Sequence, residues 1–202
     1  MNRELLLLSF FLIPFLSRVY VSEAQVVTHK YEISVAGFSI GEMQAKKQSK
    51  ENSIIYSIES KVSFWFFGRV EVDYGIETRY DGSKVVESKA YTKTNRGDFT
   101  SHVQWDRGGY EVDAETYKFE NKERIEGPLR FSSARMYFHE PTNETFFLAE
   151  NYGLKAPVKK VQEYYEVDVN GNKNKFYYDA EGVLIKAVMQ SPIKNYVISR
   201  IE

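Results

Sequence analysis

The sequence predicts an all-β protein, in which a curved antiparallel sheet or half-barrel of about ten strands is covered on its concave face by one short helix or loop insertion. Three observations predict this fold. Apolar and polar residues alternate along most of the chain, turn signals recur about every 8–12 residues, and one irregular interval interrupts the alternation. Successive side chains of a strand point to opposite faces, so the alternation indicates one buried and one solvated face. Parallel sheets covered by helices would show continuous apolar runs instead.

The first segment, residues 1–24, is predicted to be a secretory signal peptide. Arg3 supplies the positive start, residues 5–16 form an almost uninterrupted apolar run, and Ser22 and Ala24 place small residues at a cleavage site. A helix that spans a bilayer needs about 20 apolar residues, which makes a membrane anchor the less favoured alternative. The chain has no cysteine to carry a lipid anchor. We therefore expect an exported, soluble protein, periplasmic or extracellular, that is neither a lipoprotein nor an integral membrane protein after cleavage.

Residues 25–202 are expected to form a single β half-barrel domain. The alternation is most regular over residues 27–35, 54–64 and 70–80, and in each run the apolar side chains share one face. No stretch has the composition of a linker or of a low-complexity segment. The strands are therefore expected to belong to one continuous sheet.

Turn signals separate the predicted strands. The dipeptides at 81–82 (Asp-Gly) and 170–171 (Asn-Gly) are two-residue hairpin signals, because both central residues of such a turn need positive φ. Gly37 and Gly41 bracket three residues, which favours a bulge or a tight bend at that point.

One interval, residues 126–159, departs from the alternation and is expected to be an irregular insertion in the same domain. Residues 129–138 can form one short helix, with Ser132 or Ser133 as a possible N-cap. Proline and glycine punctuate the remainder of the interval, and strands are expected to resume near Gln162. The insertion is the element expected to cover the concave face.

Composition excludes several classes of function. Lys and Arg total 27 against 28 for Asp and Glu, which argues against a nucleic-acid partner. The absence of cysteine excludes disulfides, thiol nucleophiles and Cys-ligated metals. The three histidines, His29, His102 and His139, do not have the spacing of metal ligands, and no serine-hydrolase or phosphate-loop motif is present. We expect no catalytic residues, no metal and no cofactor, and hence a protein that is not an enzyme.

Acidic pairs two residues apart are the remaining candidates for chemistry. Such pairs share one face of a strand and could bind a hard cation or act as acid and base, but the valine between them takes the core side. We expect their carboxylates to face water. A carboxylate hydrolase would need Glu42 or Glu140 to be buried in a cleft beside Arg135. The pairs are Glu71 with Asp73, Glu111 with Asp113, and Glu166 with Asp168.

Two aromatic groups stand outside the alternation. In residues 64–67, Trp65 and Phe67 place large aromatic rings on the side that is otherwise polar. Packing beneath another element is the expected outcome, because monomers rarely expose such patches; an exposed tip that contacts a ligand or a membrane is the alternative. The second group is expected to close the open side of the sheet. It comprises Tyr137, Phe138, Phe146 and Phe147.

Residues 31–42 (YEISVAGFSIGE) resemble the opening of exported bacterial proteins of the domain-of-unknown-function family 6134, in which a first strand runs into a Gly-x-x-x-Gly-Glu bend. Residues 133–141 (SARMYFHEP), 177–179 (YYD) and 182–184 (GVL) are similar to a branch found in marine and gut Bacteroidetes. The resemblance spans nearly all of the mature chain. It implies a relation to the domain-of-unknown-function 3108 proteins and a half-barrel wrapped about a helix, as in periplasmic lipoprotein carriers. It implies no catalytic residues.

Together these observations predict a non-catalytic binder of an apolar or amphipathic, lipid-like molecule, held between the concave face and the insertion. The alternative is a structural or protein-interaction module of the cell envelope without a small ligand, whose partners are other envelope proteins. The candidate ligand-binding residues are Tyr31, Ile33, Tyr56, Ile58, Trp65, Val72, Tyr74, Ile76, Tyr137 and Phe138.

Overall fold

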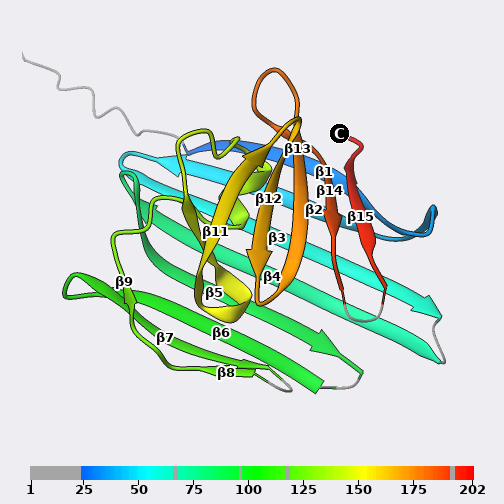
Figure 1. Ribbon diagram of the computed structural model, residues 1–202, viewed down its shortest axis with the longest axis horizontal. Helices are drawn as coiled ribbons and strands as arrows, with labels where there is room; N and C mark the ends of the chain where they lie inside the picture. Colours follow the sequence, from blue (N-terminus) through cyan, green and yellow to red (C-terminus); the bar gives the residue numbers. More distant parts are fainter. Residues whose placement is uncertain (1–23, 66–67, 96, 117–118, 192–193) are drawn as a thin grey trace, which may run out of the picture.

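One antiparallel sheet of fifteen strands makes up most of the described protein, together with two short 3-10 helices (Figure 1). The computed structural model describes residues 24–65, 68–95, 97–116, 119–191 and 194–202. Apart from Ala24, the predicted signal peptide lies outside the described residues. The elements are β1 (Gln25–Val35), β2 (Phe38–Lys50), β3 (Ser53–Trp65), β4 (Arg69–Asp81), β5 (Lys84–Thr94), β6 (Gly97–Asp106), β7 (Gly109–Thr116), β8 (Phe119–Asn121), β9 (Ile125–Glu126), η1 (Ala134–Tyr137), β10 (Phe146–Ala149), η2 (Glu150–Tyr152), β11 (Leu154–Val161), β12 (Tyr164–Val169), β13 (Asn172–Tyr178), β14 (Leu184–Met189) and β15 (Tyr196–Arg200).

The predicted all-β antiparallel fold is confirmed, but the sheet has more strands than the ten or so expected. Strands β8, β9 and β10 have three, two and four residues and lie in or near the interval that lacks alternation. Strands this short show no clear period of two, so the sequence pattern does not reveal them. The strands also resume earlier than the predicted restart near Gln162. Strand β11 begins at Leu154 and includes Pro157, which lies in the interval predicted to be irregular.

The chain enters the sheet in its middle. From β1, strands β2 to β8 follow one another outward on one side, and strands β15 to β10 follow in reverse order on the other. In Figure 1 strands β11–β13 cross the long strands β2–β5, and buried residues from both groups belong to one hydrophobic core. The sheet therefore curls around a shared interior.

The turns alternate between two ends of the sheet. The Gly37 end carries the β1–β2 turn, in which Ala36 and Gly37 have φ of 50° and 85°, and the connection from Trp65 to Arg69. The Gly82 end carries the β2–β3 and β4–β5 turns. The bend expected around Gly37 is confirmed, with a bulge between Ile33 and Ser34.

The predicted hairpin at 170–171 is confirmed, with φ of 50° and 80° at its two central residues. At 81–82 the prediction is off by one residue. Asp81 pairs with Lys84, so the two-residue turn consists of Gly82 and Ser83. Glycine is required at Gly41 for a different reason, because an added Cβ would lie 2.3 Å from the carbonyl oxygen of Lys61 in β3.

The insertion fills the interior. We call residues 129–138 the plug segment. The helix predicted over this segment is formed only at η1, as a 3-10 helix. Ser133 is its N-cap residue, but the Ser133 side chain makes no capping hydrogen bond. The plug segment contributes a run of buried side chains to the core: Leu129, Phe131, Ala134, Met136, Tyr137 and Phe138. Among the described residues, no helix is long and apolar enough to cross a membrane.

Candidate functional site

Most of the predicted ligand-binding residues lie in the closed core. Seven of the ten are less than one-tenth exposed, and their neighbours are other core side chains and the plug segment. Tyr137 and Phe138 belong to the plug segment itself, and the Tyr31 and Tyr137 rings meet edge to face at 5.3 Å. A ligand could reach these seven only if the plug segment left the concave face. They are Tyr31, Ile33, Tyr56, Ile58, Ile76, Tyr137 and Phe138.

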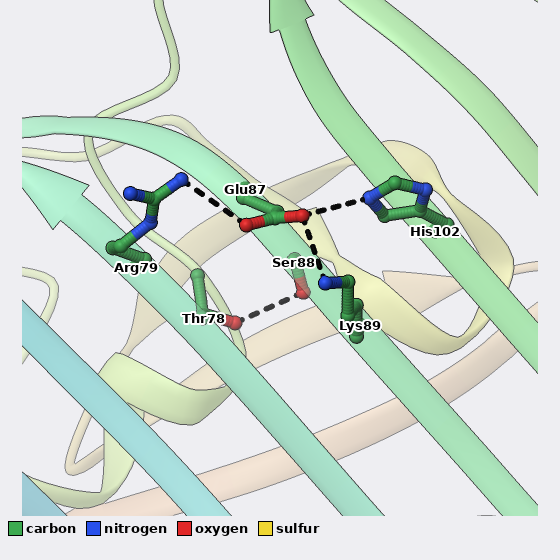
Figure 2. Close-up of polar contacts among 6 residues, drawn as sticks. All are labelled: Thr78, Arg79, Glu87, Ser88, Lys89 and His102. Carbon is green, nitrogen blue, oxygen red and sulfur yellow. Dashed lines mark hydrogen bonds and ion pairs between the residues drawn. The ribbon is translucent and has the colours of Figure 1, made fainter.

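A buried carboxylate fastens the plug segment to the sheet. Glu150 is 1% exposed, and its Oε2 accepts a hydrogen bond from the Ser133 amide at 2.8 Å. Its Oε1 accepts from the Ala134 amide and from Thr78 Oγ1, both at 3.0 Å. Thr78 Oγ1 also lies 3.0 Å from Ser88 Oγ. Figure 2 shows this contact between the two side chains. A buried carboxylate is tolerated only where donors surround it, and here they come from both the plug segment and β4.

Tyrosine hydroxyls add further anchors. Tyr31 donates to the carbonyl oxygens of Tyr137 and Leu184, both at 3.2 Å. Tyr110 donates to the Val85 carbonyl at 3.0 Å and accepts from the Leu129 amide at 2.9 Å. Burial raises the pKa of the Tyr31 and Tyr110 hydroxyls, so both stay neutral donors. These bonds hold the plug segment in one position.

The two carboxylates named for a hydrolase do not meet Arg135. Glu42 is exposed, and Glu140 accepts a bond from Lys160 Nζ at 2.9 Å. That bond to Lys160 lowers the pKa of Glu140, against a smaller opposing effect of burial. The arrangement that would favour a carboxylate hydrolase is therefore not formed.

The outer face of the sheet carries solvated charges. The Glu87 carboxylate lies 3.1 Å from Arg79 Nη2, 3.0 Å from Lys89 Nζ and 3.1 Å from His102 Nε2. Figure 2 shows these three side chains around the carboxylate. The hydrogen bond from Lys89, and then that from His102, lowers the pKa of Glu87. Thr78 and Ser88, the sequence neighbours of Arg79 and Glu87, point the other way into the core. This is the alternation that the sequence predicts.

The predicted acidic pairs show the same alternation of outward carboxylates and inward apolar side chains. Glu111 and Asp113 are exposed, while Val112 between them is buried. In β12 Val167 is buried, and Glu166 pairs with Lys159 at 3.1 Å on the other face. The prediction that these carboxylates face water is confirmed for Glu111 with Asp113 and for Glu71 with Asp73, whereas Glu166 and Asp168 are half-buried on the outer face. Ion pairs of this kind on a solvated face contribute little to stability.

The accessible part of the predicted site lies at the Gly37 end. Trp65 is 78% exposed there, so the expectation that it packs beneath another element is wrong. Trp65 lies on the outward face of β3, together with the exposed residues Lys61 and Ser63. No described element covers that face at the end of the strand, so the ring stays in water. Val72 and Tyr74 are half-buried, and the Tyr74 hydroxyl accepts from Asn151 Nδ2 at 3.2 Å. Phe66 and Phe67 lie outside the described residues.

We define the mouth as four inward-facing, half-buried residues of β3 and β4: Val62, Phe64, Val72 and Tyr74. Val62 stands opposite Val72 in the sheet, and Phe64 stands opposite the buried Val70. Phe38, at the start of β2, is 76% exposed at the same end. Sequence reasoning did not select Val62 or Phe38, and it named Phe64 only within the aromatic stretch 64–67. The alternation shows which face these residues occupy, but it does not show where the elements that cover that face end.

The second aromatic group behaves largely as predicted. Tyr137, Phe138 and Phe147 are buried and help to close the concave side. Phe146 is 45% exposed instead, and Lys155 Nζ lies 4.8 Å from the centre of its ring. Phe146 is the first residue of β10, and the three residues that follow it in this strand are buried.

Comparison with known proteins agrees with this fold. The protein family described as Domain of unknown function (DUF6134) matches residues 31–201. The chain belongs to this family. The predicted family is thereby confirmed, whereas the Bacteroidetes origin and the relation to the 3108 family stay predictions.

This DUF6134 protein is also similar to a solved structure. The beta-barrel-like protein of the Domain of Unknown Function DUF1849 from Brucella abortus matches with a TM-score of 0.51 and 12% identity, over 87% of this chain and 95% of that chain. At this identity the likeness shows the fold alone. No curated protein matches the chain.

Proposed function

We propose that this DUF6134 protein is an exported, non-catalytic binding protein that contacts an apolar or amphipathic molecule at the mouth. The observation that carries the proposal is the contrast within β3 and β4. Inward residues farther from the Gly37 end of these strands, such as Tyr56 and Ile76, are buried, whereas Val62, Val72 and Tyr74 are half-buried. The mouth is therefore an apolar part of the concave face that an external molecule can reach.

The chemistry of the mouth suits an amphipathic molecule with an apolar chain. Two valines, a phenylalanine and a tyrosine offer apolar surface, and exposed Trp65 lies beside them in sequence at the strand end. Indole combines an apolar ring with one N–H donor, which favours contact at the boundary between apolar groups and water. Exposed aromatic groups gathered at one place are typical of interaction sites.

A non-catalytic role is supported by the state of the carboxylates. The buried one, Glu150, is occupied by three donors of the protein, and Glu87 is neutralised by three basic groups in water. A general acid or base needs a free side chain next to a substrate. Neither of these carboxylates meets that requirement.

Tryptophan fluorescence tests the proposal. The Trp105→Phe variant leaves Trp65 as the sole tryptophan, and its emission is followed while a fatty acid is added. Trp65 ends β3 directly after Phe64, so a bound chain that extends past the strand end reaches its ring, and we expect a blue shift that saturates. Trp105 packs against Tyr110 and Lys84, at 5.0 Å and 4.2 Å, and phenylalanine keeps an aromatic ring at that position.

A matched pair of variants controls the experiment. Binding of a fluorescent fatty acid should be lost in Val72→Asp and kept in Phe146→Ala, which removes an exposed aromatic group far from the mouth in the strand order. Absence of saturable binding in the unmodified protein, with no lipid found by native mass spectrometry, would refute the proposal. That result would favour the alternative, a protein-interaction module of the envelope. The filled interior supports this alternative.

A further inference from the structure

Three basic side chains meet at the Gly82 end, the end opposite the mouth. Lys47 of β2 faces the interior. It stands opposite Tyr56 of β3, which in turn stands opposite Thr78 of β4, and both of these partners are buried. The Lys47 Nζ lies 3.4 Å from Nε2 of His139, which directly follows the plug segment. Arg135, in η1, is the third member. All three side chains are half-buried, so solvent reaches them.

Two tyrosine rings form a floor that places Arg135 and His139 side by side. The Tyr56 and Tyr80 rings are 5.3 Å apart. The His139 ring lies edge-on to Tyr56 at 6.1 Å, and the Arg135 guanidinium lies 5.5 Å from the centre of the Tyr80 ring. The His139 amide also donates to the Arg135 carbonyl at 3.1 Å, which fixes the two residues one turn apart.

In the part of the chain that the structure describes, these basic groups have no acidic partner. Of the described carboxylates, none lies within ion-pair distance of Lys47, Arg135 or His139. The carboxylates next to the plug segment are engaged elsewhere: Glu150 by its three donors and Glu140 by Lys160.

Arg135 also keeps an unused donor. Its Nη1 donates to the Arg130 carbonyl at 2.7 Å, but its Nε is buried and has no hydrogen-bond partner. Burial without a bond is costly for a charged donor, and like charges held together add to that cost. An anion in the cluster would remove both penalties.

The electrostatics of the free protein agree with an empty anion site. Burial and the charge of Arg135 lower the pKa of Lys47. Burial, Lys47 and Arg135 together lower the pKa of His139 to about 4, so its ring is neutral at pH 7. A bound anion would act in the opposite direction and raise the pKa of His139.

We propose that Lys47, Arg135 and His139 bind a phosphate-type oxyanion at the Gly82 end. An arginine fork and a lysine ammonium are the pair of side chains that proteins use for phosphate, the first for its paired donors and the second as a point charge. The neutral imidazole can take up a proton as the anion binds. The site is independent of the mouth, because the two lie at opposite ends of the sheet.

Titration with inorganic phosphate tests the site. The signal to follow is the NMR resonance of the His139 ring in the purified protein, together with its pKa. We expect a saturable shift and a higher pKa of His139 when phosphate is bound, and binding weakened by about tenfold or more in Lys47→Met. Methionine keeps most of the apolar stem of Lys47, so this variant should fold.

Lys46→Met is the matched control. Lys46 is the neighbour of Lys47 on the opposite face of β2, and its removal changes the net charge by the same amount. Phosphate binding should be unchanged in this variant. No saturable shift in the unmodified protein, or an equal loss in Lys46→Met and Lys47→Met, would overturn the proposal.

Two further probes identify the source of the phosphate group. Glycerol 3-phosphate represents a soluble ester, and phosphatidylcholine vesicles with phosphatidylglycerol represent a lipid headgroup. Binding that depends on Lys47 with either probe supports the site and names its source. Binding to the vesicles that is equal in Lys47→Met and Lys46→Met counts against it.

Discussion

Replacing Glu150 by alanine should weaken the attachment of the plug segment to the sheet. The change removes an acceptor of the Ser133 and Ala134 amides and of the Thr78 hydroxyl. The Ser133 amide keeps its bond to the Leu148 carbonyl and Thr78 keeps its contact with Ser88, so of the three donors the Ala134 amide is left unsatisfied. Each unsatisfied buried donor costs about 1–3 kcal/mol. One unsatisfied amide and two lost bonds together should lower the free energy of unfolding by about 2–4 kcal/mol. Total stabilities of domains are about 5–15 kcal/mol, so the loss is large.

Urea denaturation measures this loss, and Glu87 provides the matched control. Glu87 also has three partners, but it lies on the solvated face (Figure 2). The Glu87→Ala variant should lose less than about 1 kcal/mol, since exposed ion pairs contribute little. If Glu150→Ala costs no more than Glu87→Ala, the plug segment is not held by the buried carboxylate and the reasoning is refuted.

Three further predictions concern stability. Trp65→Ala should cost less than about 1 kcal/mol in urea denaturation and Tyr56→Ala about 3–5 kcal/mol, because only the second ring is buried; equal costs would contradict this. The protein should lose stability as the pH falls from 6.5 to about 4, because the pKa of His139 is lowered on folding and the unfolded chain binds the proton first. The melting temperature of His139→Phe should fall less over this range, and an unchanged pH dependence would count against the effect. Gly41→Ala should cost about 1–3 kcal/mol, because the added Cβ forces β2 and β3 apart. In Gly37→Ala the added Cβ meets no neighbouring atom, and the change acts only through the φ of 85°. We expect the lower melting temperature for Gly41→Ala, and a lower one for Gly37→Ala would contradict the effect of the clash.

The period of two in the sequence was sufficient to predict the sheet and the faces of its strands. It placed Tyr31, Tyr56 and Ile76 inside and Glu111 and Asp113 outside, as the structure has them. This works because the face of a strand residue depends on its own position and not on distant partners. The same parity placed Trp65 outside, and the expectation of packing was wrong because it assumed a covering element.

Features that depend on distant partners could not be predicted. The bond between Glu150 and Thr78 joins residues 72 positions apart, and nothing in the local sequence distinguishes Glu150 from a surface glutamate. Strands β8 to β10 exist only because longer strands pair with them. One signal for the basic cluster was present: Lys47 has the same parity as buried Met43 and Ala45, and a lysine on the inward face is unusual.

Photo-crosslinking tests the central claim, binding at the mouth and not in the centre of the concave face. A fatty acid with a photoreactive group at the end of its chain is added to the protein, irradiated, and the labelled peptides are mapped by mass spectrometry. We predict that the label falls on β3 and β4 near Val62, Phe64 and Val72, and that excess unlabelled fatty acid removes it. A label on Tyr56, on the plug segment, or scattered over the outer face would contradict the account.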